Sequence, residues 1–255
     1  MVVQHGPERS EVDRTEVVDA DGPTVTAKLN RGRWVWEWIK SIVVAFTLFL
    51  VIRTFLVEAF RIPTGSMENT LLVGDFLLVN KAVYGAQLPL TQMRLPAFTD
   101  PQRGDIVVFV PPHEPGKNYV KRLVGLPGDT LAMRDKVLYL NGRALDEPYT
   151  HHNDPGDGFA SRMYWQCDYL ATPVRRDRCR PTRDNWGPIV VPSGKYMVLG
   201  DNRDDSEDSR YWGFVERASI KGRPLFIYYS FDGTTLRPVP WLTGIRWNRI
   251  GGGIS

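Results

Sequence analysis

The sequence predicts a mainly antiparallel β protein with one N-terminal transmembrane helix. The 255 residues include 19 prolines and 23 glycines, which indicates many turns and therefore short strands. One long apolar segment lies near the N-terminus, and the eight tryptophans suit a protein that contacts a membrane interface. The formal net charge of +3 is too small to favour a nucleic-acid partner, and none is expected.

The chain begins with an acidic segment, and we expect residues 1–33 to form a disordered cytoplasmic tail. Its charged side chains before residue 28 are Glu8, Glu11, Asp13, Glu16, Asp19 and Asp21 against Arg9 and Arg14. Large apolar residues are few, so this segment cannot bury enough surface to offset the entropy of ordering it.

Residues 34–57 follow as the predicted transmembrane anchor. The last twenty of them contain two charges, Lys40 and Arg53, and both side chains can extend to the lipid headgroups. A buried core helix is disfavoured because no amphipathic period is present. A cleaved signal peptide is also disfavoured, since a long acidic tail precedes the segment and no small-x-small site follows it. Four bases precede the apolar core and two follow it, so the positive-inside bias predicts a cytoplasmic N-terminus and an extracytoplasmic domain over residues 58–250.

Beyond the anchor, short apolar segments alternate with turn residues, as is typical of antiparallel sheets. The predicted strands are 75–81, 106–110, 119–124, 137–140, 143–145, 189–191, 196–199, 225–231 and 245–247. Asn141-Gly142 suits the type I′ turn of a hairpin. Residues 85–104 and 200–210 are expected to be loops, 146–187 an inserted segment, and 251–255 a flexible C-terminus.

Ser66 lies nine residues beyond the anchor, in Pro63-Thr64-Gly65-Ser66-Met67. Pro63 restricts the backbone and Gly65 permits a sharp turn, so the stretch can present the Ser66 hydroxyl and a backbone N–H. A serine nucleophile needs a base for its proton and donors for the oxyanion, and Thr64 with the Ser66 N–H can supply those donors. An ordinary loop has the same composition, so these five residues alone leave both interpretations open.

Lysine is the candidate base, because the four histidines fall in no order that suggests a Ser-His-Asp triad. An unperturbed lysine is protonated at pH 7, but burial in an apolar site lowers its pKa. Lys121 lies in the predicted strand 119–124, whose two faces are both largely apolar. The alternative is an edge position from which the side chain reaches water.

Four blocks resemble those of bacterial type I signal peptidases, in the same order along residues 34–250. They are Pro63–Met67 followed by Thr70-Leu71 and Gly74-Asp75, then Arg103–Phe109, Tyr119–Asp129 and Gly200–Gly213. The resemblance implies a single-pass endopeptidase of the bacterial cytoplasmic membrane. Its partners would be the lipid bilayer and exported pre-proteins, whose signal peptides it removes after small residues of the Ala-x-Ala type.

The same resemblance implies a Ser-Lys dyad, with Ser66 as nucleophile, Lys121 as general base and an acyl-enzyme intermediate. Thr64 and Ser66 would form the oxyanion hole. Supporting roles are implied for Ser206, which would orient the lysine, for the pair Asp208 and Arg210, and for Asp201 and Arg203. Asn69 stands where many members have proline, and residues 146–187 align with no part of the family pattern.

Cys167 and Cys179 are the two cysteines, and we expect a disulfide between them outside the membrane. Reduced thiols are the alternative. A zinc site with His151 and His152 is disfavoured because the spacing matches no usual pattern. No cofactor or metal is expected.

Two rival functions share some of these features. An SOS-response repressor shares Ser-Lys autoproteolysis but needs a DNA-binding domain, for which an acidic tail and an anchor leave no place. A catalytically silent, membrane-anchored binding protein of the same fold is the second rival, and the presence of both Ser66 and Lys121 disfavours it.

Overall fold

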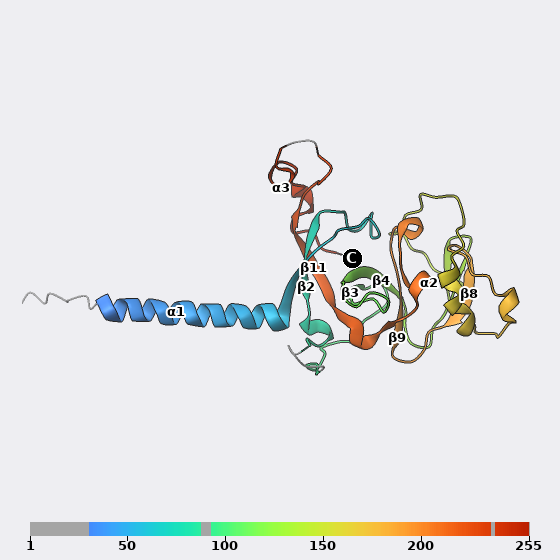
Figure 1. Cartoon of the computed structure of the whole chain (residues 1–255), viewed down its shortest axis with the longest axis horizontal. Helices are drawn as coiled ribbons and strands as arrows, with labels where there is room; N and C mark the ends of the chain where they lie inside the picture. The colour runs from blue at the N-terminus through green and yellow to red at the C-terminus, as the bar shows by residue number, and fades with distance from the viewer. Residues whose placement is uncertain (1–30, 88–92, 236–237, 255) are drawn as a thin grey trace, which may run out of the picture. The chain divides into compact units, whose positions relative to one another are not determined.

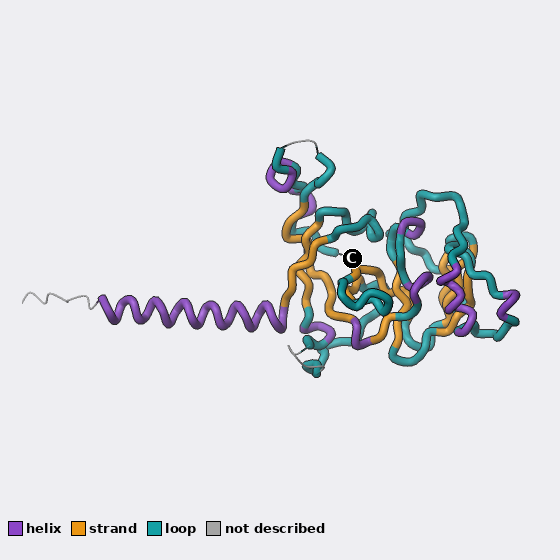
Figure 2. The backbone as a smooth tube through the Cα atoms, viewed as in Figure 1, coloured by secondary structure: helices purple, strands orange, loops and turns teal. Residues whose placement is uncertain are grey.

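The computed structural model describes residues 31–87, 93–235 and 238–254, and these described residues fall into two units that divide after Ala45. The predicted tail lies outside the described residues up to position 30. Figure 1 and Figure 2 show one long helix near the N-terminus and a remainder built from strands, loops and short helices. The predicted fold class is confirmed.

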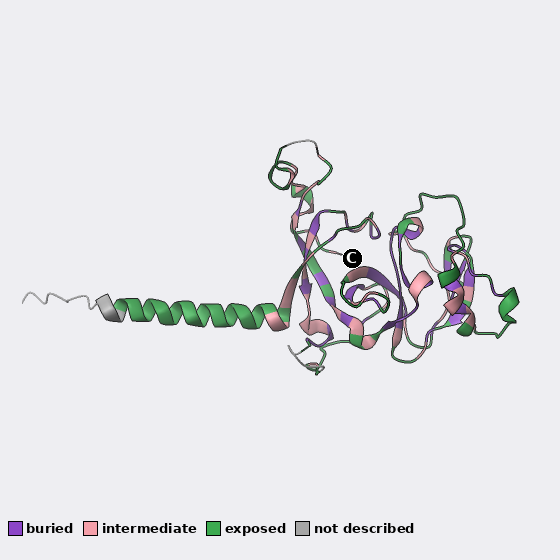
Figure 3. Ribbon diagram, in the orientation of Figure 1, coloured by how far each residue is buried: buried purple, intermediate pink, exposed green. Residues whose placement is uncertain are grey.

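The N-terminal helix is α1 (Arg31–Val51), and it continues into a π-helical turn, η1 (Ile52–Leu56). The 23 residues Trp34–Leu56 are long and apolar enough to cross a membrane, judged by length and composition. At 1.5 Å per residue they extend roughly 34 Å, against a hydrocarbon core of about 30 Å. Their large side chains are exposed (Figure 3). The helix extends through the predicted segment 34–57 as far as Leu56, and Val57 begins the first strand.

A seven-stranded antiparallel sheet carries the candidate serine and lysine segments. Its strands, in spatial order, are β1 (Val57–Arg61), β2 (Asp75–Asn80), β11 (Ile220–Ser230), β3 (Ile106–Phe109), β4 (Tyr119–Gly125), β9 (Lys195–Leu199) and β10 (Val215–Glu216). β1 is the first strand of this order and pairs with β2 alone, so its other edge has no strand beside it in the described part of the chain.

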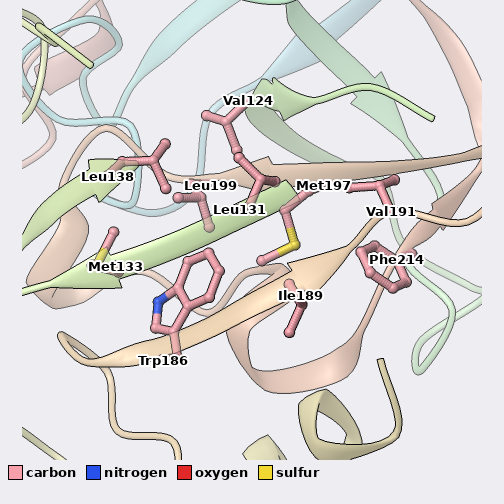
Figure 4. Close-up of a cluster of buried hydrophobic side chains, with 10 residues drawn as sticks. All are labelled: Val124, Leu131, Met133, Leu138, Trp186, Ile189, Val191, Met197, Leu199 and Phe214. Atoms are coloured by element: carbon pink, nitrogen blue, oxygen red, sulfur yellow. The ribbon is translucent and has the colours of Figure 1, made fainter. Parts of the chain in front are cut away.

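A second, four-stranded sheet follows β4 in the chain. Its order is β7 (Arg143–Ala144), β6 (Val137–Leu140), β5 (Thr130–Arg134) and β8 (Trp186–Val190). Buried side chains of this sheet pack with residues of β4 and β9 in one apolar cluster, which Figure 4 shows in close-up. This shared core ties the two sheets together, so the second sheet stabilises the strands that carry the site.

The hairpin predicted at Asn141-Gly142 is confirmed: both residues have positive φ, 50° and 84°, as a type I′ turn requires. Three strands were not predicted, namely β1, β5 and β10. The prediction of a strand at 245–247 was wrong. Ile245 makes an isolated bridge to Phe231, and a 3-10 turn, η7 (Trp247–Arg249), follows. The predicted strand 225–231 is the second half of the longer β11.

The inserted segment is mostly irregular, with two 3-10 helices, η3 (Ser161–Asp168) and η4 (Arg176–Arg178). The predicted disulfide is present and links Cys167 of η3 to Cys179, the residue directly after η4. The remaining short helices are η2 (Ala82–Tyr84), η5 (Arg203–Asp205), α2 (Ser209–Trp212), η6 (Arg217–Ser219) and α3 (Pro240–Thr243). The C-terminus, predicted to be flexible, folds back here onto β11: the Gly251 N–H donates to the Ile227 carbonyl at 2.8 Å.

Asp75 holds the end of the chain to the start of β2. Its side chain is fully buried and accepts bonds from Ser230 Oγ (2.7 Å), from the Leu72 N–H (2.8 Å) and from the Arg249 guanidinium (2.7 and 3.1 Å). A buried carboxylate with this many donors leaves several groups unsatisfied when it is removed.

We expect Asp75→Ala to lower the free energy of unfolding by about 3 kcal/mol, because it leaves the Arg249 charge and two buried donors without their acceptor. The measurement is urea unfolding of the full chain in detergent. Asp232→Ala removes a half-exposed carboxylate near Arg246 and should cost less than about 1 kcal/mol. Equal losses for the two variants would contradict the role given to Asp75.

Candidate active site

Ser66 sits in a turn that is fixed at both ends by the sheet. The Ile62 N–H donates to the Asp75 carbonyl (2.8 Å) and the Gly74 N–H donates to the Ile62 carbonyl (3.0 Å), which closes residues 62–75 into a loop. Met67 beside the serine is buried in an apolar cluster with Ile62. The backbone on both sides of Ser66 is therefore fixed by buried residues, Ile62 and Met67, and this fixes the position of the hydroxyl.

Lys121 lies in the middle of β4, where its side chain is buried at 3% exposure. Its Nζ atom is 2.5 Å from Ser66 Oγ, although the two residues are 55 positions apart in the sequence. The edge position that would let the lysine reach water is excluded, because β3 and β9 flank β4. The two residues predicted to form the dyad thus lie within hydrogen-bonding distance.

Burial lowers the pKa of Lys121 from 10.5 to about 8, because an ammonium loses its hydration in this site. The carboxylate of Asp208 acts in the opposite direction, as do those of Asp201 and Glu207, whereas the Arg210 guanidinium lowers the pKa further. The balance leaves a lysine that is neutral in a sizeable fraction of molecules near neutral pH, which an exposed lysine is not.

Asp208 and Arg210 form a fully buried ion pair next to the dyad. The guanidinium donates to both carboxylate oxygens, at 2.8 and 2.9 Å, and Asp208 also accepts the Gly200 N–H at 3.1 Å. Burial alone would raise the pKa of Asp208, but the Arg210 charge holds that pKa below its usual range. The predicted pairing of these two residues is present in the structure.

Ser206 is buried close to the nucleophile, without a hydrogen-bond partner for its hydroxyl among the described residues. A side chain at Gly200 would come within 2.2 Å of Ser206 Oγ and 2.4 Å of the Ser66 carbonyl oxygen, so these three residues pack tightly. The structure therefore brings Ser206 to the site but gives it no bond to Lys121, and its orienting role stays a prediction.

A cavity of about 670 Å³ opens onto the dyad. Residues Phe60–Met67 and Lys117–Lys121 line it, together with Asp205 and Glu207. Thr64 is exposed on this lining near Ser66, where the sequence predicted a donor for the oxyanion hole. The cavity is open enough to admit an extended peptide between two stretches of protein backbone.

Comparison with known proteins identifies the family of this chain. A family model described as "Signal peptidase, peptidase S26" matches residues 35–229. Signal peptidase I of Pseudomonas aeruginosa is 39% identical over 250 residues, which cover 92% of this chain and 84% of that protein. Signal peptidase I of Pseudomonas fluorescens is 38% identical over 238 residues, covering 89% and 82%. A signal peptidase I crystal structure from Enterococcus faecalis aligns at 36% identity over 50% of this chain and 98% of its own, with a TM-score of 0.34.

This chain belongs to the signal peptidase family, peptidase S26. The predicted resemblance is confirmed, and the chain is a peptidase and hence a hydrolase. Family membership and the N-terminal apolar helix together indicate a membrane-anchored signal peptidase.

The sequence reasoning missed a second buried ion pair in this signal peptidase. Arg122 donates to both oxygens of the fully buried Asp201, at 2.8 and 2.9 Å, and Thr70 Oγ1 donates to the same carboxylate at 2.5 Å. The Tyr149 ring covers the guanidinium, 3.8 Å from its centroid. The predicted support residue Asp201 therefore links β4 to the segment after Ser66. The sequence offered one indication of this pair, because Arg122 stands next to Lys121 in a largely apolar strand.

Two further contacts connect the inserted segment to the site. Arg203 donates to both carboxylate oxygens of Glu147, at 2.8 and 2.9 Å. Trp165 Nε1 and Gln166 Nε2 both donate to the Arg210 carbonyl, at 3.1 and 2.9 Å. The segment that aligned with no part of the family pattern thus packs against the loop that carries the Asp208–Arg210 pair.

The backbone conformation at Asn69 explains why asparagine stands where many family members have proline. Its φ is 86°, in the left-handed region, which proline cannot adopt and which asparagine tolerates well. Its side-chain amide donates to the Tyr149 carbonyl at 3.2 Å. The turn after Ser66 is therefore built differently here without changing a candidate catalytic group.

We expect Lys121→Met to stabilise this signal peptidase below pH 8. A pKa of about 8 in the folded state, against 10.5 unfolded, means that folding a protonated Lys121 costs on the order of 3 kcal/mol. Methionine avoids that cost, so the gain should be largest below pH 8 and should disappear as the pH rises towards 10.5.

The measurement is urea unfolding of both proteins in detergent between pH 6 and 10. Lys117→Met, which removes an exposed lysine of the same cavity, controls for the loss of one positive charge. A gain that does not depend on pH, or that Lys117→Met reproduces, would contradict the burial cost assigned to Lys121.

Proposed function

We propose that this chain cleaves the N-terminal signal peptides of exported pre-proteins, through a dyad in which Ser66 is the nucleophile and Lys121 the general base. The observation that carries the proposal is the distance of 2.5 Å between Ser66 Oγ and Lys121 Nζ, combined with the burial of that lysine. Burial supplies the neutral amine that a base needs, and the short distance lets it take the hydroxyl proton directly.

The proposed chemistry has two stages. Neutral Lys121 takes the Ser66 proton while Oγ attacks the carbonyl carbon of the cleaved peptide bond, and the resulting oxyanion accepts bonds from the Ser66 N–H and the Thr64 hydroxyl. Lys121 then gives its proton to the departing amine, leaving the signal peptide as an ester on Ser66. Finally Lys121 takes a proton from water, whose oxygen attacks the ester. Lys121 then returns that proton to Ser66 Oγ as the ester bond breaks, which releases the signal peptide with a free carboxyl group and restores the neutral lysine.

Substrate binding is proposed to occur by strand addition along Phe60–Pro63. These residues line the cavity, and the edge of β1 away from β2 has no strand beside it among the described residues. An extended segment ending in Ala-x-Ala would gain main-chain hydrogen bonds there, while small pockets select its side chains. Ser206, Asp201 and the Asp208–Arg210 pair are proposed to hold Ser66 and Lys121 in register.

We infer a single-pass topology in the bacterial cytoplasmic membrane. The tail, residues 1–33, would be cytoplasmic, residues 34–57 would span the bilayer, and residues 58–250 would form the extracytoplasmic catalytic domain. The positive-inside bias supports this orientation, and the Cys167–Cys179 disulfide suits an oxidising compartment. The alternative of a catalytically silent binding protein of the same fold is less favoured, because it gives no reason to bury a lysine against a serine.

The first test is cleavage of a pre-protein with an Ala-x-Ala site, in detergent, by wild type, Ser66→Ala and Lys121→Met. We expect wild type to cut after the second alanine and both variants to lose at least about 10³-fold in rate, because each lacks one half of the dyad. Circular dichroism confirms that the variants are folded. A folded variant that cuts at the wild-type rate would remove that residue from the mechanism, and an inactive wild type would favour the binding-protein alternative.

The pH dependence of cleavage tests the base separately. Protonated Lys121 cannot accept the serine proton, so kcat/KM should rise about tenfold per pH unit below pH 8 and level off above it. Initial rates between pH 6 and 10, on a substrate that does not titrate in this range, give the profile. A flat profile, or one that falls as the pH rises through 8, would exclude a lysine base of this pKa.

A further inference from the structure

Two carboxylates, Asp205 and Glu207, line the same cavity as the dyad. Neither one transfers a proton or bonds to the reacting groups in the mechanism above, although Glu207 raises the pKa of Lys121. Both side chains are exposed, and they flank the buried Ser206. Because they face the space that a substrate would occupy, they are candidates for recognising charge on it.

The loop that carries them is held rigidly. Just before it, the fully buried Asp204 carboxylate accepts two bonds from Lys136 Nζ, at 2.8 and 2.9 Å, and one from the Asp154 N–H at 2.8 Å. Just after it, Asp208 is fixed by Arg210. The two exposed carboxylates therefore project from a loop that is anchored on both sides, as a site that discriminates between substrates requires.

The charged groups of the cavity differ in their partners. Lys117 pairs with Glu114 at 2.7 Å, the Arg61 guanidinium lies over the rings of Phe76 and Phe231, and Glu207 pairs with the half-exposed Arg162. Asp205 has no side-chain hydrogen bond or ion pair within the described part of the chain. The charge of Asp205 is thus available to a ligand, and the charge of Glu207 is paired with an exposed arginine.

The position of the loop indicates which part of a substrate it meets. Phe60–Ser66 and Lys117–Lys121 both lead towards the dyad in chain order, so the cavity has a far end at Phe60 and Lys117. The loop begins at the other end, since the Asn202 N–H donates to the Ser66 carbonyl at 3.2 Å and its amide to the Gly65 carbonyl at 3.3 Å. We therefore assign the residues before the cut to the two walls, and the residues after it to a path past Asp205.

We propose that Asp205 and Glu207 select substrates by the charge of the first residues after the cleaved bond, favouring basic side chains there and disfavouring acidic ones. This inference rests on the proposed function, because it assigns the walled part of the cavity to the Ala-x-Ala segment. The effect is electrostatic at a partly exposed site, so it is moderate in size and weakens with salt.

The experiment uses the full chain in detergent and three sets of pre-proteins with the same Ala-x-Ala site. Lysine, glutamine or aspartate is placed at the first, second or third position after the cut, and in a parallel series at the second position before it. We expect kcat/KM for lysine to exceed that for aspartate by about fivefold at the most sensitive position after the cut, and the ratio to shrink at 0.5 M salt.

Three variants assign that ratio to its source. Asp205→Asn keeps the shape of the side chain and should reduce the ratio to about twofold, and the double variant with Glu207→Gln should bring it close to one. Glu216→Gln removes an exposed carboxylate on β10, outside the cavity lining, and should leave the ratio as in wild type.

The outcomes separate this inference from the proposed function. If wild type cuts the glutamine substrates but shows no preference between lysine and aspartate, the charge selection is wrong and the function stands. A preference that survives in the double variant, that Glu216→Gln removes equally, or that appears only before the cut also overturns it. If wild type cuts none of the substrates, the proposed function itself fails.

Discussion

The burial of Lys121 is the constraint on which the rest of this structure depends. A lysine in an apolar sheet is costly when charged, and the protein keeps it 2.5 Å from a serine hydroxyl rather than letting it reach water. Strands on both sides of β4 keep the lysine away from any edge of the sheet. Burying the ammonium lowers the stability of the fold. The same burial lowers the pKa of Lys121 and so makes the amine a base.

The surrounding charges moderate that instability without cancelling it. Asp208 would favour a charged lysine, but its own ion pair with Arg210 offsets most of that attraction. The Arg122–Asp201 pair lies on the opposite side of β4, where it ties the strand to Thr70 beyond the serine. Two buried pairs therefore fix the geometry, while neither one places a free carboxylate against the amine. The inserted segment contributes by packing against the carbonyl of Arg210.

Much of the site could be predicted, because its residues lie in short sequence blocks in which each residue type indicates its chemical role. These residues are Ser66, Lys121, Asp208 and Arg210. Contacts between distant segments could not be predicted: Arg122 meets Asp201 across 79 positions and Arg203 meets Glu147 across 56. In the fold, β1 was missed because it follows the apolar helix without a turn residue to separate them. β5 was missed because its short run lies between charged residues, and tertiary pairing with β6 and β8 determines it.

The open edge of β1, which is proposed to bind the substrate, also exposes the protein to unwanted pairing with other chains. An unpaired strand edge pairs with any extended chain, including a second copy of the same protein, and so promotes aggregation. Here the exposed length is five residues, it carries charges at Glu58 and Arg61, and Pro63 ends its capacity to donate shortly beyond. Such an edge is long enough to hold one short peptide segment and too short and too charged to nucleate a growing sheet.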